Sequence, residues 1–192
     1  VTDRCQLRCS YCMPPDGVHL HGKEEILSYE EITSLVACMR DEFGLAKLRI
    51  TGGEPLVRPE IERLVGMLSD LGIRDLAITT NGLRLSRMAP ILKQAGLHRV
   101  NVSLDSLCPD TFRRITGGGE LRAVLDGIAA ALDRGLTPLK LNTVVIRGVN
   151  DEEVDRIMTF AIEAGCEARF IELMPIGPGA RIFSDGFVSS EA

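Results

Sequence analysis

The feature that most constrains the fold is a pattern that occurs five times: a helical segment ends in glycine, and a short apolar run follows. The glycines are Gly44, Gly72, Gly96, Gly135 and Gly165, and the runs span 48–50, 76–78, 100–102, 139–146 and 169–173. Glycine just past a helix adopts the left-handed cap that releases the chain into the next element. With an opening strand before Cys5, this pattern predicts six strands that alternate with helices and pair in parallel.

Several helix boundaries can also be predicted. Ser28 with Glu31 has the spacing of a capping box, and Asn150 with Glu153 has the same spacing. Residues 120–134 are predicted to form the longest helix, preceded by three flexible glycines.

Polar or glycine-rich clusters follow nearly every predicted strand. They lie at 5–12, 52–55, 79–82, 103–106, 142–143 and 172–175. An open doubly wound sheet would gather its site at one switch point. A curved sheet instead brings all the carboxyl ends of its strands to one mouth. The sequence therefore predicts an α/β fold, a partial (β/α)6 barrel of the TIM type.

Three cysteines within eight residues form the clearest chemical signal. Cys5, Cys9 and Cys12 have the spacing C-x3-C-x2-C on a predicted loop. Three thiolates can bind three irons of an iron–sulfur cluster and leave one iron open for a further ligand. A zinc knuckle and three unrelated buried thiols are the alternatives, although structural zinc normally has four protein ligands.

Composition limits the possible partners and the compartment. The 192 residues, 45% of them hydrophobic, suffice for one domain, and a net charge of −5 without a basic run argues against nucleic-acid or membrane-surface binding. No stretch resembles a membrane span or signal peptide, so a cytoplasmic location is expected. Cys38, Cys108 and Cys166 are scattered and are predicted to be small core residues.

The strand ends offer further candidate ligands. Gly52 and Gly53 allow a close approach to the backbone, and Glu54 offers a carboxylate to an ammonium group, although Gly-Gly-Glu-Pro also suits a turn. Thr80 lies in a polar turn. Asp105 could cap a helix or bind a ribose.

Two cations occupy predicted strands. Lys140 alternates with Asn142 on one side of its strand, and Arg49 lies within an earlier strand. A lysine facing a barrel interior needs an anionic partner, such as a phosphate. Met174 could pack on an adenine or fill the core.

These features together resemble the radical S-adenosylmethionine (SAM) superfamily. The resemblance rests on the cysteine spacing, on Tyr11 before the last cysteine and on Gly-Gly-Glu-Pro after the second strand. It implies a [4Fe–4S] cluster on Cys5, Cys9 and Cys12. It also implies that SAM chelates the open iron and yields a 5′-deoxyadenosyl radical that abstracts hydrogen from a substrate.

Within that superfamily the chain resembles the MoaA family of GTP 3′,8-cyclases, which begin molybdenum cofactor synthesis. The matching motifs are Val-Thr-Asp-Arg-Cys, Arg-Ile-Thr-Gly-Gly-Glu-Pro-Leu-Val-Arg, Thr-Thr-Asn-Gly, Arg-Val-Asn-Val-Ser-Leu-Asp-Ser, Lys-Leu-Asn-Thr-Val-Val and Phe-Ile-Glu-Leu-Met-Pro-Ile-Gly. By this resemblance the SAM contacts are Tyr11, Gly53, Glu54, Ser103 and Met174. The GTP contacts are Arg49, Thr80 and Lys140.

The resemblance also implies partners and a missing part. The expected partners are GTP, an electron donor of the flavodoxin or ferredoxin type, and cyclic pyranopterin monophosphate synthase, which receives the product; a homodimer is possible. The family carries a second cluster in its C-terminal region and a GTP-binding arginine upstream. Residues 1–192 are therefore expected to be one radical SAM core domain, truncated at both ends, that cleaves SAM slowly and makes little cyclised GTP.

Two other functions remain open from the sequence. One is another radical SAM reaction, such as oxidation of a peptide, because the same cysteine loop and Gly-Gly-Glu-Pro would serve it. The other is a non-catalytic module that binds zinc or a cluster for electron transfer.

Overall fold

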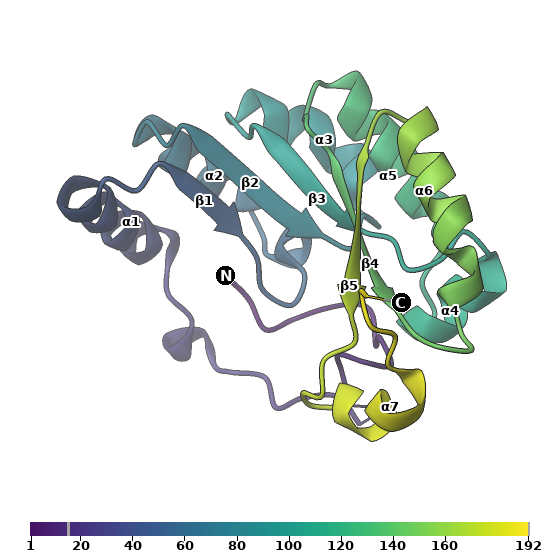
Figure 1. The fold of residues 1–192 in the computed structure, drawn as a ribbon. Helices are drawn as coiled ribbons and strands as arrows, with labels where there is room; N and C mark the ends of the chain where they lie inside the picture. The colour runs from purple at the N-terminus through teal and green to yellow at the C-terminus, as the bar shows by residue number, and fades with distance from the viewer. Residues whose placement is uncertain (15, 192) are drawn as a thin grey trace.

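The structure is a computed structural model, which describes residues 1–14 and 16–191. One parallel sheet has its five strands in the order β1-β2-β3-β4-β5, so each strand pairs with the next in sequence. The strands are β1 (Lys47–Ile50), β2 (Asp75–Thr80), β3 (Arg99–Ser103), β4 (Lys140–Val145) and β5 (Glu167–Glu172). The sheet twists and curves (Figure 1), as expected for a partial barrel.

Seven α-helices accompany the sheet in the described ranges, and several of them cover its outer face. They are α1 (Tyr29–Phe43), α2 (Ile61–Asp70), α3 (Leu85–Gln94), α4 (Pro109–Thr116), α5 (Leu121–Asp133), α6 (Val154–Glu163) and α7 (Gly179–Gly186), with short 3-10 turns η1 (Lys23–Glu25), η2 (Pro55–Val57) and η3 (Asp151–Glu153). In Figure 1, α2, α3, α5 and α6 lie along the outside of the sheet, whereas α7 and the N-terminal segment lie near the ends to which the strands point. No helix in the described ranges is long and apolar enough to cross a membrane.

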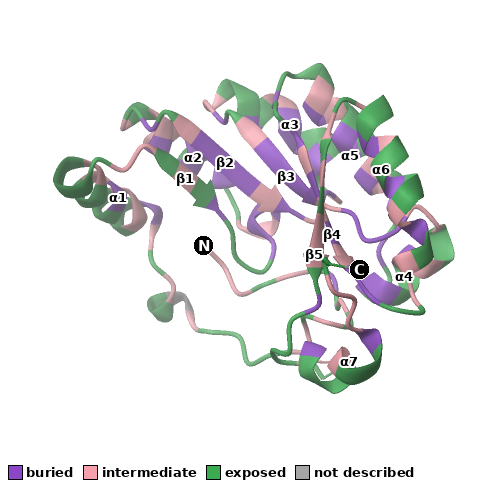
Figure 2. Ribbon diagram, in the orientation of Figure 1, coloured by how far each residue is buried: buried purple, intermediate pink, exposed green. Residues whose placement is uncertain are grey.

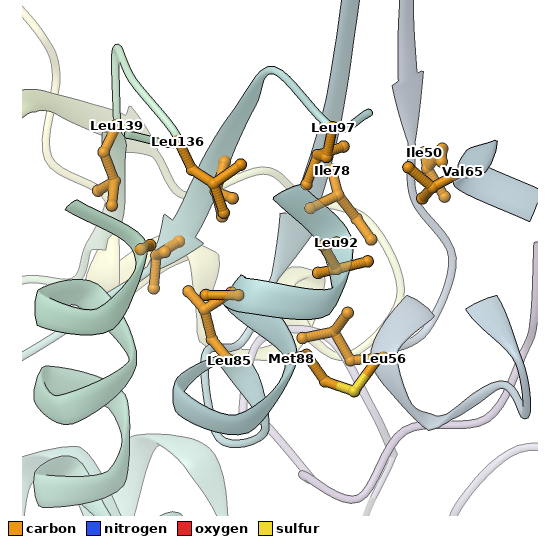
Figure 3. Packing of buried hydrophobic residues seen from close by; sticks show 14 of the residues in the cluster. Ile50, Leu56, Val65, Ile78, Leu85, Met88, Leu92, Leu97, Leu136 and Leu139 are labelled. Atoms are coloured by element: carbon orange, nitrogen blue, oxygen red, sulfur yellow. The ribbon is translucent and has the colours of Figure 1, made fainter. Parts of the chain in front are cut away.

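The core lies between the sheet and the outer helices. Leu76 and Ile78 of β2 are fully buried, and Leu85 and Leu92 of α3 are buried with them. Figure 3 shows Ile78, Leu85 and Leu92 close to their buried neighbours. Figure 2 shows the buried positions concentrated on the strands and inner helix faces. The core holds the strand ends in fixed positions, and those ends carry the site.

Local signals predicted most helix ends correctly. All five predicted glycine caps have positive φ, from +65° at Gly44 and Gly135 to +99° at Gly96. The capping box of Ser28 and Glu31 is present in full.

Three local predictions were wrong. The longest helix is α1 with 15 residues, whereas α5, in the segment 120–134, has 13. Asn150 and Glu153 form no capping box, because both side chains are bonded to other strand ends. Cys38 is exposed rather than in the core, while Cys108 and Cys166 are half-buried.

The opening segment is not the sixth strand that the sequence predicted. Residues Val1–Arg4 are extended beside the loop that follows β1 but are not assigned to the sheet. The Gly53 N–H donates to the Thr2 carbonyl at 2.6 Å, and the Glu54 N–H donates to the Arg4 carbonyl at 2.8 Å. These bonds place the cysteines that follow directly above the end of β1.

Candidate functional site

A cavity of about 280 Å³ lies at the carboxyl ends of the strands. It gathers eight of the predicted site residues: Cys5, Cys9, Tyr11, Cys12, Gly53, Glu54, Thr80 and Ser103. They come from the N-terminal loop and from the ends of β1, β2 and β3. The curved sheet thus brings residues that are up to 98 positions apart in sequence to one mouth.

The cysteine loop, residues 5–12, is hydrogen-bonded to the C-terminal end of α4. The Arg8 N–H donates to the Thr116 carbonyl at 2.9 Å, and the Ser10 N–H donates to the Ile115 carbonyl at 2.8 Å. The last carbonyls of a helix have no partner within the helix, so the loop satisfies two of them. Gly117, the left-handed cap of α4, leaves the necessary space, since a Cβ there would lie 2.8 Å from the Arg8 carbonyl oxygen.

Gly52 and Gly53 permit close contact between two chain segments. A Cβ on Gly53 would lie 2.5 Å from the Arg4 carbonyl oxygen, and one on Gly52 would lie 2.5 Å from that of Thr2. The residues just before the cysteines therefore occupy the space that the two glycines provide. Neither glycine has positive φ.

Glu54 is buried and holds the end of the next strand. Its Oε1 accepts hydrogen bonds from the Leu56 N–H at 2.9 Å and the Thr80 hydroxyl at 2.7 Å, and its Oε2 accepts one from the Asn81 N–H at 2.6 Å. Burial raises the pKa of this carboxyl, while the three donors oppose that shift. The predicted contact of Glu54 with an ammonium group stays a prediction, as does the nucleotide contact of Thr80.

The buried Asp105 and the half-buried Tyr11 form a hydrogen-bonded pair beside the cysteines. The Tyr11 hydroxyl donates to Asp105 Oδ2 at 2.7 Å, and the Val144 N–H donates to Asp105 Oδ1 at 2.9 Å. Burial raises the pKa of Asp105 to about 6, although both donors lower it. Burial also raises the pKa of Tyr11 well above its ordinary value.

Cys5, Cys9 and Cys12 line one cavity from one short loop, which suits three thiolate ligands of an iron cluster. In the ranges that the structure describes, no three His, Cys, Asp or Glu side chains converge on one metal position. A cluster needs more widely spaced thiolates, because each binds a different iron.

The surroundings of the thiols also fit a cationic centre. Burial is the main cause that raises the pKa of Cys9 to about 12, and it raises the pKa of Cys12 as well. Bound iron would favour the deprotonated thiolates and so oppose the rise in pKa that burial causes. Asn142 lines the same cavity, and its Oδ1 is buried without a hydrogen-bond partner among the described residues, which leaves a polar atom for a ligand.

Three predicted residues do not line this cavity. Met174 is 58% exposed after β5. Arg49 of β1 is exposed, and Lys140 of β4 pairs with Glu167 of β5.

The two cations nevertheless lie on the cavity side of the sheet. Thr79 lines the cavity and is in register with Asn101, which is in register with Lys140. Arg49 is in register with Ala77, two residues before Thr79. Residues in register across a parallel sheet share a face. Arg49 and Lys140 therefore lie on the same face as the cavity, nearer the amino ends of the strands.

The contribution of α4 and of the buried carboxylate of Glu153 was not predicted from the sequence. Phe112 and Thr116 line the cavity, but their spacing matches that of any amphipathic helix. Glu153 is buried, and accepts hydrogen bonds from the Ser106 hydroxyl and the Leu107 N–H. These partners could not be predicted from the position of Glu153 at the start of a helix, because they lie 46 and 47 positions away in sequence.

Comparison with known proteins places this cavity in a family. The profile of the radical SAM superfamily matches residues 1–161. GTP 3′,8-cyclase of Alkaliphilus oremlandii is 50% identical over all 192 residues, and GTP 3′,8-cyclase of Clostridium botulinum is 46% identical over the same length. The chain spans about 60% of the length of each of these curated relatives.

Solved structures show the same fold. SuiB of Streptococcus suis bound to S-adenosylmethionine superimposes on 88% of this chain and 36% of its own, with a TM-score of 0.70 and 22% identity. The enzyme anSMEcpe with bound AdoMet superimposes on 88% of this chain and 49% of its own, with a TM-score of 0.70 and 18% identity. The partial TIM-type barrel predicted from the sequence is thereby confirmed, with five strands described rather than six.

The chain belongs to the radical SAM superfamily. Membership brings the two cofactors that the sequence predicted, a [4Fe–4S] cluster and SAM. Cys5, Cys9 and Cys12 are the residues of this chain that would hold the cluster, since they reach one cavity from one short loop. This assignment is supported by the cavity and by the resemblance, and it stays a prediction for each thiol.

Proposed function

We propose that this chain is the radical SAM core of a GTP 3′,8-cyclase, which converts GTP to (8S)-3′,8-cyclo-7,8-dihydroguanosine 5′-triphosphate for molybdenum cofactor synthesis. The observation that carries the proposal is 46–50% identity to cyclases along the whole chain, against 22% or less to SuiB and anSMEcpe. That contrast favours a cyclase over the other radical SAM reactions that the sequence left open.

When bound, the cofactors supply an electron and a 5′-deoxyadenosyl radical, which are the difficult part of the chemistry. The chain itself binds and orients. In the proposal, Cys5, Cys9 and Cys12 hold the cluster. Tyr11, Gly53, Glu54, Ser103 and Met174 place SAM.

The substrate's phosphates would lie over the inner face of the sheet below the cavity. Arg49 and Lys140 both lie on this face, and phosphate is the anion that paired Arg and Lys side chains recognise. Lys140 now pairs with Glu167, so a bound phosphate would compete with that carboxylate. Thr80 would contribute from the end of β2.

Partners and location follow from the same proposal. The expected electron donor is a flavodoxin or ferredoxin, cyclic pyranopterin monophosphate synthase would take the product, and a homodimer is proposed. The location would be cytoplasmic, because a reducing compartment preserves thiols for a cluster.

The test uses the full-length protein under anaerobic conditions with reductant, SAM and GTP. We expect 5′-deoxyadenosine and cyclised GTP in equal amounts, whereas residues 1–192 alone should give 5′-deoxyadenosine with little cyclised product. Arg49→Ala and Lys140→Ala should weaken GTP binding to the full-length protein at least tenfold. Arg113→Ala, which removes an exposed ion pair with Glu120, is the matched control.

Two results would count against the proposal. Full-length protein that consumes SAM but leaves GTP unchanged would show that the substrate is another molecule. Unchanged GTP binding in both cation variants would refute the phosphate site even if cyclisation is observed.

A further inference from the structure

We propose that Asp105 is a positioning residue that fixes the cysteine loop through the phenol of Tyr11. The inference rests on membership of the radical SAM superfamily and does not require GTP to be the substrate. It concerns a contact between residues 94 positions apart that joins the loop to the ends of β3 and β4.

Asp105 is fixed at three points. Its Oδ2 accepts from the Tyr11 hydroxyl at 2.7 Å, its Oδ1 accepts from the Val144 N–H at 2.9 Å, and its carbonyl oxygen accepts from Asn150 Nδ2 at 2.7 Å. The residue is 2% exposed. The carboxylate therefore cannot turn toward a ligand without leaving a buried N–H or hydroxyl unsatisfied.

A second buried carboxylate supports the same segment. Glu153 accepts from the Ser106 hydroxyl at 2.6 Å and from the Leu107 N–H at 2.9 Å. Asn150 also accepts from the Ile146 N–H at 2.7 Å, which ties β4 to this network. A fully bonded buried network is rigid, so Asp105 presents its Oδ2 at a fixed position.

The loop needs an anchor where Tyr11 lies. Long-range backbone bonds hold it at Arg8 and Ser10, whereas the Cys12 and Met13 N–H groups bond locally to the Cys9 carbonyl. The Tyr11 phenol is the next long-range attachment along the chain, and it lies between Cys9 and Cys12. Without it, the long-range hydrogen bonds made by residues 1–14 would all lie on the N-terminal side of Tyr11.

The phenol bond therefore contributes to the relative placement of the thiols. A site that binds a rigid group binds it more tightly when other hydrogen bonds already hold the ligand residues in place, because less conformational entropy is then lost on binding. Asp105 and Tyr11 provide such a bond. The Tyr11→Phe substitution would keep the aromatic ring and lose the hydrogen bond to Asp105.

The experiment compares Tyr11→Phe and Asp105→Asn with a matched control. The other tyrosine of the chain, Tyr29, donates its hydroxyl to the Pro59 carbonyl at 2.7 Å, the same length as the Tyr11 bond, but in α1 rather than in the loop. Tyr29→Phe thus removes an equivalent phenol bond elsewhere. Each variant is reconstituted anaerobically, and iron content, the electron paramagnetic resonance spectrum of the reduced cluster with and without SAM, and the SAM dissociation constant are measured.

We expect Tyr11→Phe to fold, to give a broadened cluster spectrum and to bind SAM about tenfold more weakly. Asp105→Asn should act in the same direction. The double variant should bind SAM no more weakly than the single variant with the lower affinity, because both changes act on the same Tyr11–Asp105 bond. Tyr29→Phe should match the parent in spectrum and SAM affinity.

Three results would overturn the proposal. One is a parent-like spectrum and SAM affinity for Tyr11→Phe. Another is an additive loss in the double variant. The third is an equal effect of Tyr29→Phe, which would show general destabilisation. If Asp105→Asn fails to fold, Tyr11→Phe and its control decide the question. None of these measurements contains GTP, so they stand apart from the cyclase assay.

Discussion

The Gly53→Ala substitution should disturb the seat of the cysteine loop while leaving the rest of the fold intact. A Cβ on Gly53 would lie 2.5 Å from the Arg4 carbonyl oxygen and 2.8 Å from its carbonyl carbon, whereas ordinary contacts begin at 3.4 Å. The two segments must therefore move apart by about 1 Å. The cost comes from this contact, because Gly53 does not have positive φ.

The size of the effect follows from the bonds at that point. The Gly53 N–H bonds to Thr2 at 2.6 Å and the Glu54 N–H bonds to Arg4 at 2.8 Å. Each such bond contributes about 0.5–1.5 kcal/mol, so loss of both costs about 1–3 kcal/mol. The cost of forcing a methyl group into a filled space, about 1–3 kcal/mol, is a second estimate of the same effect and is not added to the first. At about 2–4 °C per kcal/mol for a chain of this size, Tm should fall by about 2–12 °C.

The assay is thermal and urea denaturation of the metal-free chain, each followed by circular dichroism, with iron content after anaerobic reconstitution as a further readout. Gly66→Ala is the control, because a Cβ there meets open space within α2. Alanine should stabilise that helix by about 0.5–1 kcal/mol. If Gly53→Ala unfolds at the parent's urea concentration and binds as much iron as the parent, the reasoning about this contact is wrong.

Two further predictions concern stability alone. Leu92→Ala removes a fully buried side chain of α3 and should lower the free energy of unfolding by about 2–5 kcal/mol, whereas Leu35→Ala on an exposed position of α1 should change it little; equal losses would contradict the packing described. The Arg99 guanidinium donates to both carboxylate oxygens of Asp75 and lowers the pKa of that carboxyl. This stabilisation is present above the ordinary aspartate pKa of about 3.9 and is lost as the pH falls through the lower folded value. Asp75→Asn should therefore cost about 1–2 kcal/mol at pH 7 and progressively less below pH 4, and a constant difference in urea denaturation would refute the assignment.

The sequence predicted the features that depend on neighbouring residues. Glycine caps such as Gly96 could be predicted because a helix ends within a few residues of the signal that ends it. The capping box of Ser28 and Glu31 is equally local. The three cysteines could be recognised because their spacing alone brings them to one loop.

The predictions that failed concern side chains whose hydrogen-bond partners come from strands distant in sequence. Asn150 and Glu153 have the capping spacing, but the ends of β3 and β4 offer them buried partners that a helix end cannot match. Lys140 could be placed on a face of its strand from alternation. The partner of Lys140, Glu167, could be identified only once the register of β4 and β5 was known. Likewise, nothing near Tyr11 in sequence indicates Asp105.

The seat of the cysteine loop has a consequence for synthesis of the protein. The loop leaves the ribosome early, but the carbonyls that hold it belong to Ile115 and Thr116, and the bond that fixes Asp105 comes from Val144. At about 5–20 residues per second, the roughly 130 residues between Cys12 and Val144 take about 7–26 s to appear. During that interval the three thiols have emerged without their support. Iron delivered then would meet a flexible peptide, so stable cluster insertion should follow translation of β4.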